Sequence, residues 1–336
     1  IELMLSKGKI RFHFSIEDNK NNVFIIAVGT PINKSSKPNL KSLIQVLNSI
    51  GPKLKKGDQV MLRSTVPLGT TRNEVKPILE KLSNLKAGSD FHLAFAPERT
   101  IQGNAMQELY SLPQIVGGYS DECAKKAINF WSSIASTVVK VSSIEAAELV
   151  KLANNTFRDL SFAFSNNLSL LGDKYNINGY ELINAANKGY SRNPIPLPSP
   201  GVGGYCLTKD PIIYNSSLEG VNTRVKFGKW SRISNEEASK YPVQIIKKYS
   251  KRINKKLKDF KILIVGLAFK GHPETKDIRG SVTLGLIDEL SPSVKKIFVW
   301  DAVVDKKTIE TKGFNYIDNI ENMIDEVDAI IIMNNH

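Results

Sequence analysis

A chain of 336 residues exceeds what one hydrophobic core usually supports, so two or three domains are expected. Its 41% hydrophobic and 24% charged residues are typical of a soluble globular protein, and no stretch approaches the roughly 18 apolar residues of a membrane span, which excludes the membrane-embedded classes. The formal charge of +13 favours an anionic partner, whether nucleotide, nucleic acid or acidic lipid, and the alternative is that it reflects mostly solvated lysines.

Two further features of the composition narrow the class of protein. The basic run at 247–261 lacks the interleaved aromatic residues that stack on bases, so we expect no nucleic acid partner, and nothing anchors the chain in a membrane. The first residues, IELMLSKGKIRF, do not form a secretory signal. Because Cys123 and Cys206 are the only cysteines, a disulfide framework is not expected. We therefore expect a reducing cytoplasm, where a reactive thiol persists.

The first part of the chain alternates short apolar runs with helical patterns. Residues 23–28 (VFIIAV) form an apolar run that leads into Gly29, Thr30 and Pro31, which is typical of a buried parallel strand followed by a loop. Further strands are predicted at 60–65, 92–97 and 113–118, with helices at 40–50, 71–83 and 121–135. This alternation predicts an α/β fold with a doubly wound sheet.

The middle of the chain has a different period. Apolar residues recur there at helical spacing over an unusually long span, and they are Ala147, Val150, Leu152, Ala153, Phe157, Leu160, Phe164, Leu168 and Leu171. We expect one long helix that continues to Tyr175. Such a helix bridges domains, builds a dimer or packs in a core, and the pattern leaves these alternatives open. Residues 189–211 are crowded with Pro and Gly and predict a loop.

A second α/β unit follows the helical middle, with strands predicted at 261–266, 296–301 and 328–333. The expected domains are therefore 1–141, 142–240 and 241–336. A dinucleotide-binding fold begins with a strand and a Gly-rich turn under the pyrophosphate, and neither precedes VFIIAV. The chain also stops directly after a strand. We therefore expect a fragment of a longer protein.

The loop GVGGYCLTKD (201–210) carries the candidate nucleophile. Gly203 and the neighbouring glycines let backbone approach a ligand closely, and Lys209 places a cation near the sulfur of Cys206, which favours the reactive thiolate. Asp210, four residues after Cys206, is placed to orient water or a base. The alternative is a small buried thiol in a Gly-rich turn, and the loop alone leaves both interpretations open.

Lys151 and Asn155 form a second candidate pair. They are four residues apart on the predicted long helix, so they project from one face and could both donate to a developing oxyanion. The alternative is a solvated pair on an exposed stripe of the helix.

Three strand ends carry candidate binding groups. RSTVPLGTT (63–71) places hydroxyls at the edge where open α/β sheets bind ligands, and APERT (96–100) offers Glu98 to activate water at a comparable edge. GLAFKG (266–271) is expected to open a helix whose amides cradle phosphate beside Lys270, with Asp301 in the place of a ribose carboxylate. Turns and helix caps use the same residues, which is the alternative in each case.

Taken together and in order, several segments resemble the UDP-glucose and UDP-N-acetylhexosamine 6-dehydrogenase family. They are VGTP (28–31), STVPLGTT (64–71), APER (96–99), ELVKLANNTF (148–157), GVGGYCLTKDP (201–211) and GLAFKG with DIRGS (266–281). The resemblance covers nearly the whole chain, and GGYCLTKD is its most specific part. It implies two Rossmann-like domains, the first for NAD and truncated at its N-terminus, the second for the UDP moiety, joined by a helical domain that forms a homodimer.

The resemblance also implies an activity, the NAD-dependent oxidation of the C6 hydroxymethyl of a UDP-sugar to a carboxylate through a thiohemiacetal and a thioester on Cys206. It implies Lys151 and Asn155 as oxyanion donors, Asp210 as a carboxylate that assists proton transfer, and Glu98 as the glutamate that helps hydrolyse the thioester. The implied NAD contacts are Thr30, Thr65, Lys209 and Arg279. The implied substrate contacts are Ser199, Gly203, Lys270 and Arg192, the last reaching across the dimer. No metal is expected.

One position separates branches of this family. The UDP-glucose branch carries a second acid four residues after the glutamate of its P-E segment, whereas this chain has Gln102 there. That difference favours UDP-N-acetylmannosamine or its gluco epimer as substrate. The competing interpretations are a GDP-mannose enzyme, which shares the thiol, a hydroxyacid dehydrogenase, which needs no nucleophile, and a non-catalytic nucleotide-binding protein, which has no use for Cys206, Lys151 and Asn155 together.

Overall fold

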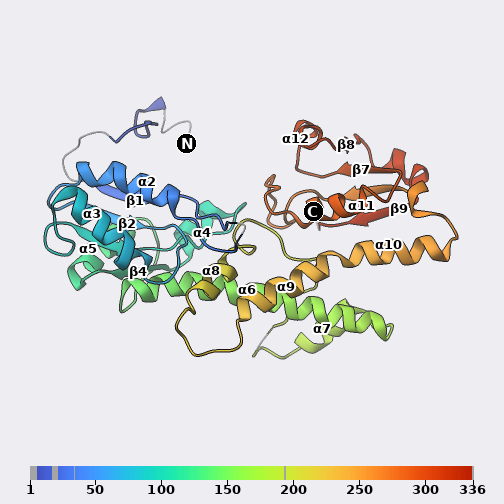
Figure 1. Cartoon of the computed structure of the whole chain (residues 1–336), viewed down its shortest axis with the longest axis horizontal. Coiled ribbons are helices and arrows are strands. Elements are labelled where there is room, and N and C mark those ends of the chain that lie inside the picture. Colours follow the sequence, from blue (N-terminus) through green and yellow to red (C-terminus); the bar gives the residue numbers. More distant parts are fainter. Residues whose placement is uncertain (1–5, 17–21, 34, 193, 335–336) are drawn as a thin grey trace. The chain divides into compact units, whose positions relative to one another are not determined.

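The computed structural model describes residues 6–16, 22–33, 35–192 and 194–334. It contains two compact units, residues 1–99 with 106–151 and residues 100–105 with 152–336. The long helix α6 (Ile144–Lys174) begins in the first unit and ends in the second (Figure 1). Within the described ranges, no helix combines the length and apolarity of a membrane span.

The first unit is built on a sheet that, over the described residues, has five strands in the order β1-β2-β3-β4-β5. The strands are β1 (Val23–Ile26), β2 (Gln59–Leu62), β3 (His92–Phe95), β4 (Gln114–Gly118) and β5 (Val138–Lys140). β1, β2 and β3 run parallel, and β4 runs parallel to β5. β4 is antiparallel to β3, because the connection at 96–113 returns at the same edge of the sheet, and the alternation of elements had not indicated this.

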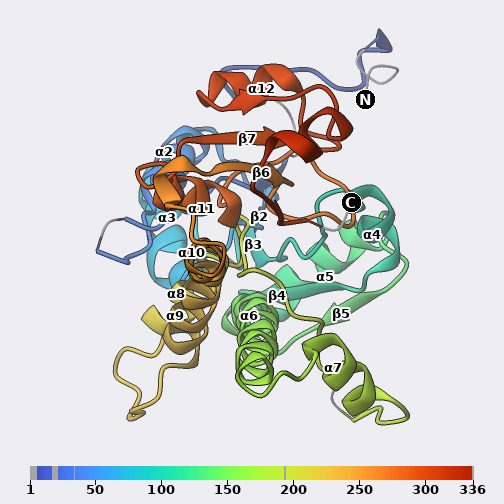
Figure 2. The ribbon, with the colours of Figure 1, turned by 90° about the vertical axis from the view of Figure 1, so that its right-hand side faces the viewer.

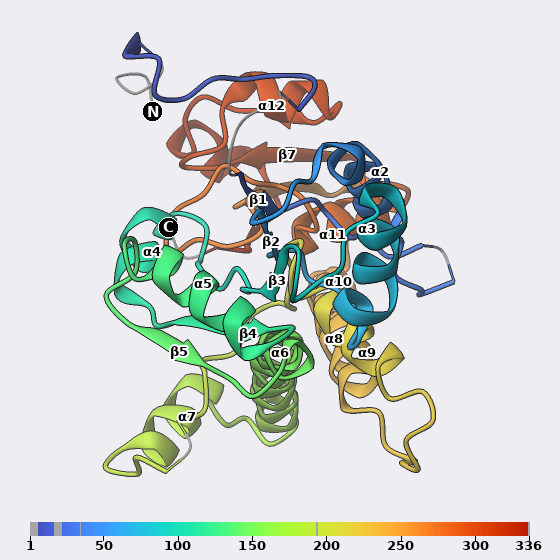
Figure 3. The same ribbon diagram turned by 90° about the vertical axis from the view of Figure 1, so that its left-hand side faces the viewer.

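Helices cover both faces of this sheet, as the doubly wound prediction requires (Figure 3). They are α2 (Lys41–Ile50), η1 (Gly51–Lys53), the π-helical turn η2 (Thr71–Val75) that continues into α3 (Lys76–Ser83), α4 (Ala105–Ser111) and α5 (Asp121–Trp131). Val60 and Leu62 of β2 pack in the core with α2 and α3, whereas Met61 packs with Trp131 of α5. This alternation along one strand gives the sheet a core on each side.

β1 differs from its prediction as a buried strand. Val23 and Ile25 are 44% and 42% exposed, and only Ile26 of the strand is buried. The reason is its position, because among the described residues β1 pairs on one side only, with β2.

α6 confirms the predicted long helix, but its buried face carries charged residues as well as apolar ones. Lys151 and Asp159 are 8% and 0% exposed, whereas Phe157, Phe164 and Leu171 are 72%, 55% and 55% exposed. These last three residues, seven apart, form one stripe along the helix, called here the exposed stripe. The apolar repeat in the sequence is therefore divided between two faces of the helix, because Ala147 and Leu152 are both 0% exposed.

The second unit contains a parallel sheet that, over the described residues, has the order β8-β7-β6-β9. The strands are β6 (Lys261–Val265), β7 (Lys296–Trp300), β8 (Asn315–Tyr316) and β9 (Ala329–Ile332). The helices after α6 are α7 (Gly179–Asn187), α8 (Asp210–Ser216), α9 (Phe227–Ser239), α10 (Tyr241–Arg252), η3 (Leu257–Asp259), α11 (Val282–Leu290), α12 (Lys306–Thr311) and η4 (Glu321–Glu326). α12 lies beside β8 (Figure 1), and α11 lies beside α10 (Figure 2). The predicted second α/β unit is confirmed, although β8, with two residues, was too short to predict.

The segment GLAFKG was expected to open a helix, and that prediction is wrong. The chain after β6 runs without a helix until Ser281, whose hydroxyl caps α11 by accepting the amide of Thr283 at 3.2 Å. A Ser N-cap is the usual start signal of a helix, and here it lies ten residues after the glycine-rich segment ends.

Candidate active site

The loop that carries Cys206 forms consecutive turns and ends where α8 begins at Asp210. A Cβ on Gly203 would lie 2.5 Å from the carbonyl oxygen of Gly280, and Gly204 donates its amide to that carbonyl at 3.0 Å. At Gly203 and Gly204 the absence of a side chain therefore lets the loop pack closely against the backbone of Gly280. Cys206 is exposed, so the alternative of a buried thiol is wrong.

Asp210 is the centre of the polar contacts around this loop. Its side chain is 0% exposed, its Oδ1 lies 2.7 Å from the ammonium of Lys209, and its Oδ2 accepts from the amide of Asn155 at 2.6 Å. Its backbone amide donates to the carbonyl of Cys206 at 2.9 Å. The structure thus brings together Cys206, Lys209, Asp210 and Asn155, which come from the loop, α8 and α6.

A second charged pair lies beside the thiol. Arg279 donates through Nη2 to Asp277 at 2.7 Å and through Nε at 3.0 Å. The hydrogen bond with Asp277, together with charge attraction to Asp277, Tyr205 and Cys206, raises the pKa of Arg279. The ring of Tyr205 lies 5.4 Å from this guanidinium and 5.3 Å from the ammonium of Lys209. Charge attraction therefore connects Arg279 with Cys206. Tyr205 and Asp277 were not singled out from the sequence.

Lys151 lies on α6, four residues before Asn155, as the sequence indicated. It is 8% exposed, so the alternative of a solvated lysine is wrong. Within the described part of the chain it forms no ion pair and no side-chain hydrogen bond. A buried ammonium without a counter-charge is costly and suits a position where negative charge develops during a reaction.

A buried ion pair between α6 and α9 supports the Cys206 loop, and it was missed from the sequence. Arg232 donates through Nη1 to Asp159 at 2.8 Å and to the carbonyls of Val202 at 3.2 Å and Leu207 at 3.5 Å. Asp159 also accepts from the hydroxyl of Ser231 at 2.6 Å. One guanidinium thus contacts the loop on both sides of the nucleophile.

In the first unit, two of the residues expected to contact NAD meet at the carboxyl ends of β1 and β2. The hydroxyl of Thr30, which is 1% exposed, donates to the carbonyl of Thr65 at 2.5 Å. Dinucleotides bind at this edge of a parallel sheet, and hydroxyl and carbonyl groups there suit the ribose and amide groups of NAD. The residues fit part of the cofactor, whereas the Gly-rich turn that binds pyrophosphate is not among those described.

A buried carboxylate on α6 fixes the loop that follows β2. Glu148, 1% exposed, accepts from the amide of Gly69 at 2.6 Å and from the amide and hydroxyl of Thr71 at 2.9 and 2.6 Å. Burial raises the pKa of Glu148, and these hydrogen bonds offset only part of that effect. The loop after β2 is therefore held to the helix three residues from Lys151.

Glu98, the expected water-activating carboxylate, follows β3 and pairs with a buried arginine. Its Oε2 lies 2.5 Å from Nη2 of Arg63, and the side chains of Glu98 and Arg63 are 45% and 5% exposed. Arg63 also donates through Nη1 to Gln114 at 3.0 Å. The buried Arg63 thus holds the carboxylate of Glu98, and solvent reaches the exposed part of that side chain.

The expected substrate contacts other than Gly203 are Ser199, Lys270 and Arg192, and all three belong to the second unit. Ser199 is exposed, and its hydroxyl donates to the carbonyl two residues later at 2.7 Å. Lys270 donates to the carbonyl of Gln102 at 2.6 Å. Arg192 is exposed, with its guanidinium 5.0 Å from the ring of Tyr190, and among the described residues it makes no contact with Cys206.

The prediction that the amides of GLAFKG cradle a phosphate is wrong for Leu267 and Ala268, the second and third residues of the segment. Asp301, 5% exposed, accepts the amides of Leu267 at 2.6 Å and Ala268 at 2.9 Å, and those of Val303 and Val304 at 2.9 and 2.8 Å. Burial opposes the ionisation of Asp301, but the four amides outweigh burial and lower its pKa. The amides and the carboxylate that were expected to bind a nucleotide therefore satisfy each other.

Domain profiles of one family match most of the chain. For the UDP-glucose/GDP-mannose dehydrogenase family, the NAD binding domain matches residues 1–135, the central domain 145–237 and the UDP binding domain 263–336.

Among the described residues, no three His, Cys, Asp or Glu side chains are grouped as metal ligands.

Individual relatives agree with these profiles. The chain is 34% identical to the UDP-N-acetyl-D-mannosamine dehydrogenase of Pyrococcus horikoshii over 336 residues, 99% of this chain and 76% of the relative. It is 34% identical to the enzyme of that name from Campylobacter jejuni, over 93% of this chain and 77% of the relative. The solved structure of the Pyrococcus horikoshii enzyme has a TM-score of 0.89 at 32% identity, covering 100% of this chain and 76% of that one. The chain therefore belongs to the UDP-glucose/GDP-mannose dehydrogenase family and is an NAD-dependent nucleotide-sugar dehydrogenase.

Proposed function

We propose that this dehydrogenase oxidises the C6 hydroxymethyl of UDP-N-acetyl-D-mannosamine to a carboxylate through a covalent intermediate on Cys206. The observation that carries the mechanism is the exposed thiol of Cys206 beside Arg279, in a loop whose next residues place Asp210 against Asn155. A simple alcohol dehydrogenase has no use for such a thiol, whereas a four-electron oxidation needs a nucleophile to hold the aldehyde.

The proposed roles follow the chemistry of each group. NAD, when bound, supplies the hydride acceptor for C6. The thiolate of Cys206 attacks the aldehyde carbon, and the C–S bond forms as the carbonyl oxygen becomes an oxyanion. Lys151 and Asn155 donate hydrogen bonds to this oxygen. Loss of a second hydride from the thiohemiacetal carbon, which a second NAD would accept, leaves a thioester. Water then adds to the thioester carbon with Glu98 or Asp210 as proton acceptor, and the C–S bond breaks to release the Cys206 thiolate.

The binding residues are also part of the proposal. Thr30 and Thr65, at the carboxyl edge of the first sheet, and Lys209 and Arg279, beside Cys206, are proposed NAD contacts. Ser199, Gly203, Lys270 and Arg192 are proposed substrate contacts. Lys209 is buried against Asp210. This burial supports a role for Lys209 in positioning, more than a direct contact with a phosphate from the solvent side.

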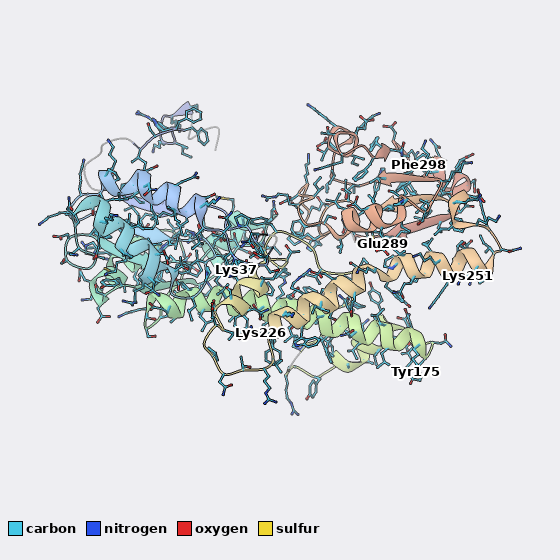
Figure 4. All side chains as sticks on the ribbon, viewed as in Figure 1. Lys37, Tyr175, Lys226, Lys251, Glu289 and Phe298 are labelled. Carbon is cyan, nitrogen blue, oxygen red and sulfur yellow. The ribbon has the colours of Figure 1, made fainter. Side chains whose placement is uncertain are left out.

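The domain division at 1–141, 142–240 and 241–336 and a homodimer complete the proposal. The exposed stripe of Phe157, Phe164 and Leu171 supports a dimer through α6, because apolar residues at seven-residue spacing on one helix are the pattern of helix pairing. Tyr175, directly after α6, is 62% exposed and extends this apolar surface (Figure 4). A cytoplasmic location is proposed because the mechanism requires a reduced thiol.

The choice of sugar is tested with a substrate panel on the complete protein. We expect kcat/KM for UDP-N-acetylmannosamine to exceed the values for UDP-N-acetylglucosamine, UDP-glucose and GDP-mannose by at least about tenfold, because substrate hydroxyl and amide groups are discriminated by buried polar partners. The relatives named UDP-N-acetyl-D-mannosamine dehydrogenase and the Gln102 position support this order. A higher kcat/KM for UDP-glucose would refute the assignment of the sugar.

A further inference from the structure

Arg63 is an unusual residue for the end of a central parallel strand. It follows β2, its side chain is 5% exposed, and its guanidinium carbon lies 4.3 Å from the centroid of the Trp131 ring. Placing a guanidinium in such surroundings costs desolvation energy, which only well-placed partners offset. A buried ion pair adds little net stability compared with apolar residues of similar volume, so stability alone does not explain a cation here.

The hydrogen bonds of Arg63 hold Glu98 directly and through Gln114. Nη2 donates to Glu98 at 2.5 Å, and Nη1 donates to Oε1 of Gln114 at 3.0 Å. The amide of Gln114, which is 7% exposed, donates in turn to the carbonyl of Pro97 at 3.3 Å and to that of Ile115 at 2.8 Å. Arg63 thus holds the carboxylate directly and, through Gln114, holds the backbone one residue before it.

The charged side chains near Glu98 are arginines. Arg63, directly after β2, donates to Glu98, and the neutral Gln114 on β4 accepts from Arg63. The adjacent Arg99 directs Nη1 to the carbonyl of Pro113 at 3.2 Å. A cation at hydrogen-bond distance favours the ionised carboxylate, and 45% exposure lets water reach it.

We propose that Arg63 is a positioning residue for the hydrolysis step: it keeps Glu98 ionised and fixes one carboxylate oxygen, so that Glu98 accepts a proton from the attacking water. The inference rests on the proposed role of Glu98. In that step the water oxygen bonds to the thioester carbon and one water proton passes to Glu98. The C–S bond breaks, its electron pair leaves with Cys206 as thiolate, and the uronic acid departs.

The test follows release of the acyl group from Cys206 in the complete protein, with UDP-N-acetylmannosamine and NAD as reactants. Quenched samples are analysed by intact mass for the adduct on Cys206, and the release rate is measured against pH. For Arg63→Gln we expect release slowed by about a hundredfold, as misplaced catalytic groups typically cause. We also expect the acid limb of the profile to move to higher pH, because a carboxylate that loses a cation at hydrogen-bond distance is protonated more easily.

Two further variants separate positioning from simple support of the fold. In a Glu98→Gln background, Arg63→Gln should cause no further slowing of release, because the residue acts through the carboxylate. Arg63→Lys keeps the cation, so its acid limb should stay near that of the parent protein, and this variant carries the test if Arg63→Gln does not fold.

The contrary outcomes are distinct. Parent release rate and acid limb in Arg63→Gln, equal slowing by Arg63→Gln with and without Glu98, or an upward-shifted acid limb in Arg63→Lys would each overturn the inference while leaving the role of Glu98 intact. A parent release rate in Glu98→Gln would instead refute the role of Glu98, and the inference with it.

Discussion

Asp210 shows at the scale of one residue what the sequence could predict and what it could not. Cys206, Lys209 and Asp210 are neighbours in the chain, so a single loop was enough to propose them together. The contact of Asp210 with Asn155 joins positions 55 residues apart and depends on how α6 meets the start of α8. Local patterns do not encode such packing: the spacing of Lys151 and Asn155 suggested a pair of donors, but it did not indicate that Asn155 contacts Asp210.

Tyr241 offers a test of the residue contacts outside the site. Its hydroxyl donates to Asp173, near the end of α6, and this hydrogen bond raises the pKa of Tyr241 to about 12. Because the folded value lies above the ordinary value of about 10, the stability that the contact contributes is complete below pH ~10 and is lost as the pH rises through about 12.

Asp173→Asn should therefore return the pKa of Tyr241 towards its ordinary value. The measurement is the absorbance of ionised tyrosine against pH, with Tyr241→Phe subtracted in each background to isolate this residue. An unchanged titration in Asp173→Asn would show that the hydrogen bond does not hold the tyrosine in its neutral form.

Asp301 shows why some residue predictions failed. An acidic residue at a strand end and a glycine-rich segment after another strand are the same local signals whether they bind a nucleotide or each other. The structure pairs Asp301 with the amides of Leu267 and Ala268, more than 30 residues away along the chain. The sequence carried both groups but not their pairing.

At the scale of the element, α6 is the most informative part of the chain. Its length was predictable because helical periodicity persisted over many turns. Its orientation was not, because the buried face carries Glu148, Lys151 and Asp159 while Phe157 and Phe164 face outward. A signal was available in the sequence. Asp159 lies three turns after Glu148, so both project from the same face of the helix, and that face carries repeated charge.

The buried pair of Asp159 and Arg232 between α6 and α9 should be strongly stabilising relative to its disruption. Asp159→Asn leaves the guanidinium of Arg232, 8% exposed, with the carboxylate of Glu236, 65% exposed and 4.0 Å away, as its remaining counter-charge. We expect this variant to lower the free energy of unfolding by about 3–5 kcal/mol, the usual cost of removing one partner of a buried pair. Urea unfolding followed by circular dichroism measures it.

The matched control is an ion pair near the surface of the second sheet. Lys261 and Glu326 lie 3.2 Å apart with side chains 36% and 63% exposed. Glu326→Gln should change the free energy of unfolding by less than about 1 kcal/mol, because solvent screens an exposed pair. Equal effects of the two substitutions would contradict the assignment of the Asp159 pair as a buried clamp.

At the scale of the whole molecule, the class of fold, both α/β units and the helical middle were predictable, because periodicity reports which elements follow one another. Strand pairing was less so, as the antiparallel β4 shows. The number of chains in the active assembly depends on the exposed stripe. We expect the parent protein to sediment as a dimer and the double variant Phe157→Lys with Phe164→Lys as a monomer, because charges on a helix seam oppose its burial.

Ile245→Lys is the control for this prediction, since Ile245 on α10 is also an exposed apolar residue, at 47%. It should leave the dimer intact. Sedimentation velocity distinguishes the species, and a dimer that survives both lysines in α6 would place the interface elsewhere.

The central claim is that Cys206 carries a covalent intermediate in a four-electron oxidation. The most direct measurement is the amount of NADH formed per UDP-N-acetylmannosamine consumed, in the complete protein and in Cys206→Ser. We predict two NADH per sugar for the parent protein and the loss of this stoichiometry in the folded Cys206→Ser variant. One NADH per sugar in the parent, or two in the variant, would contradict the claim.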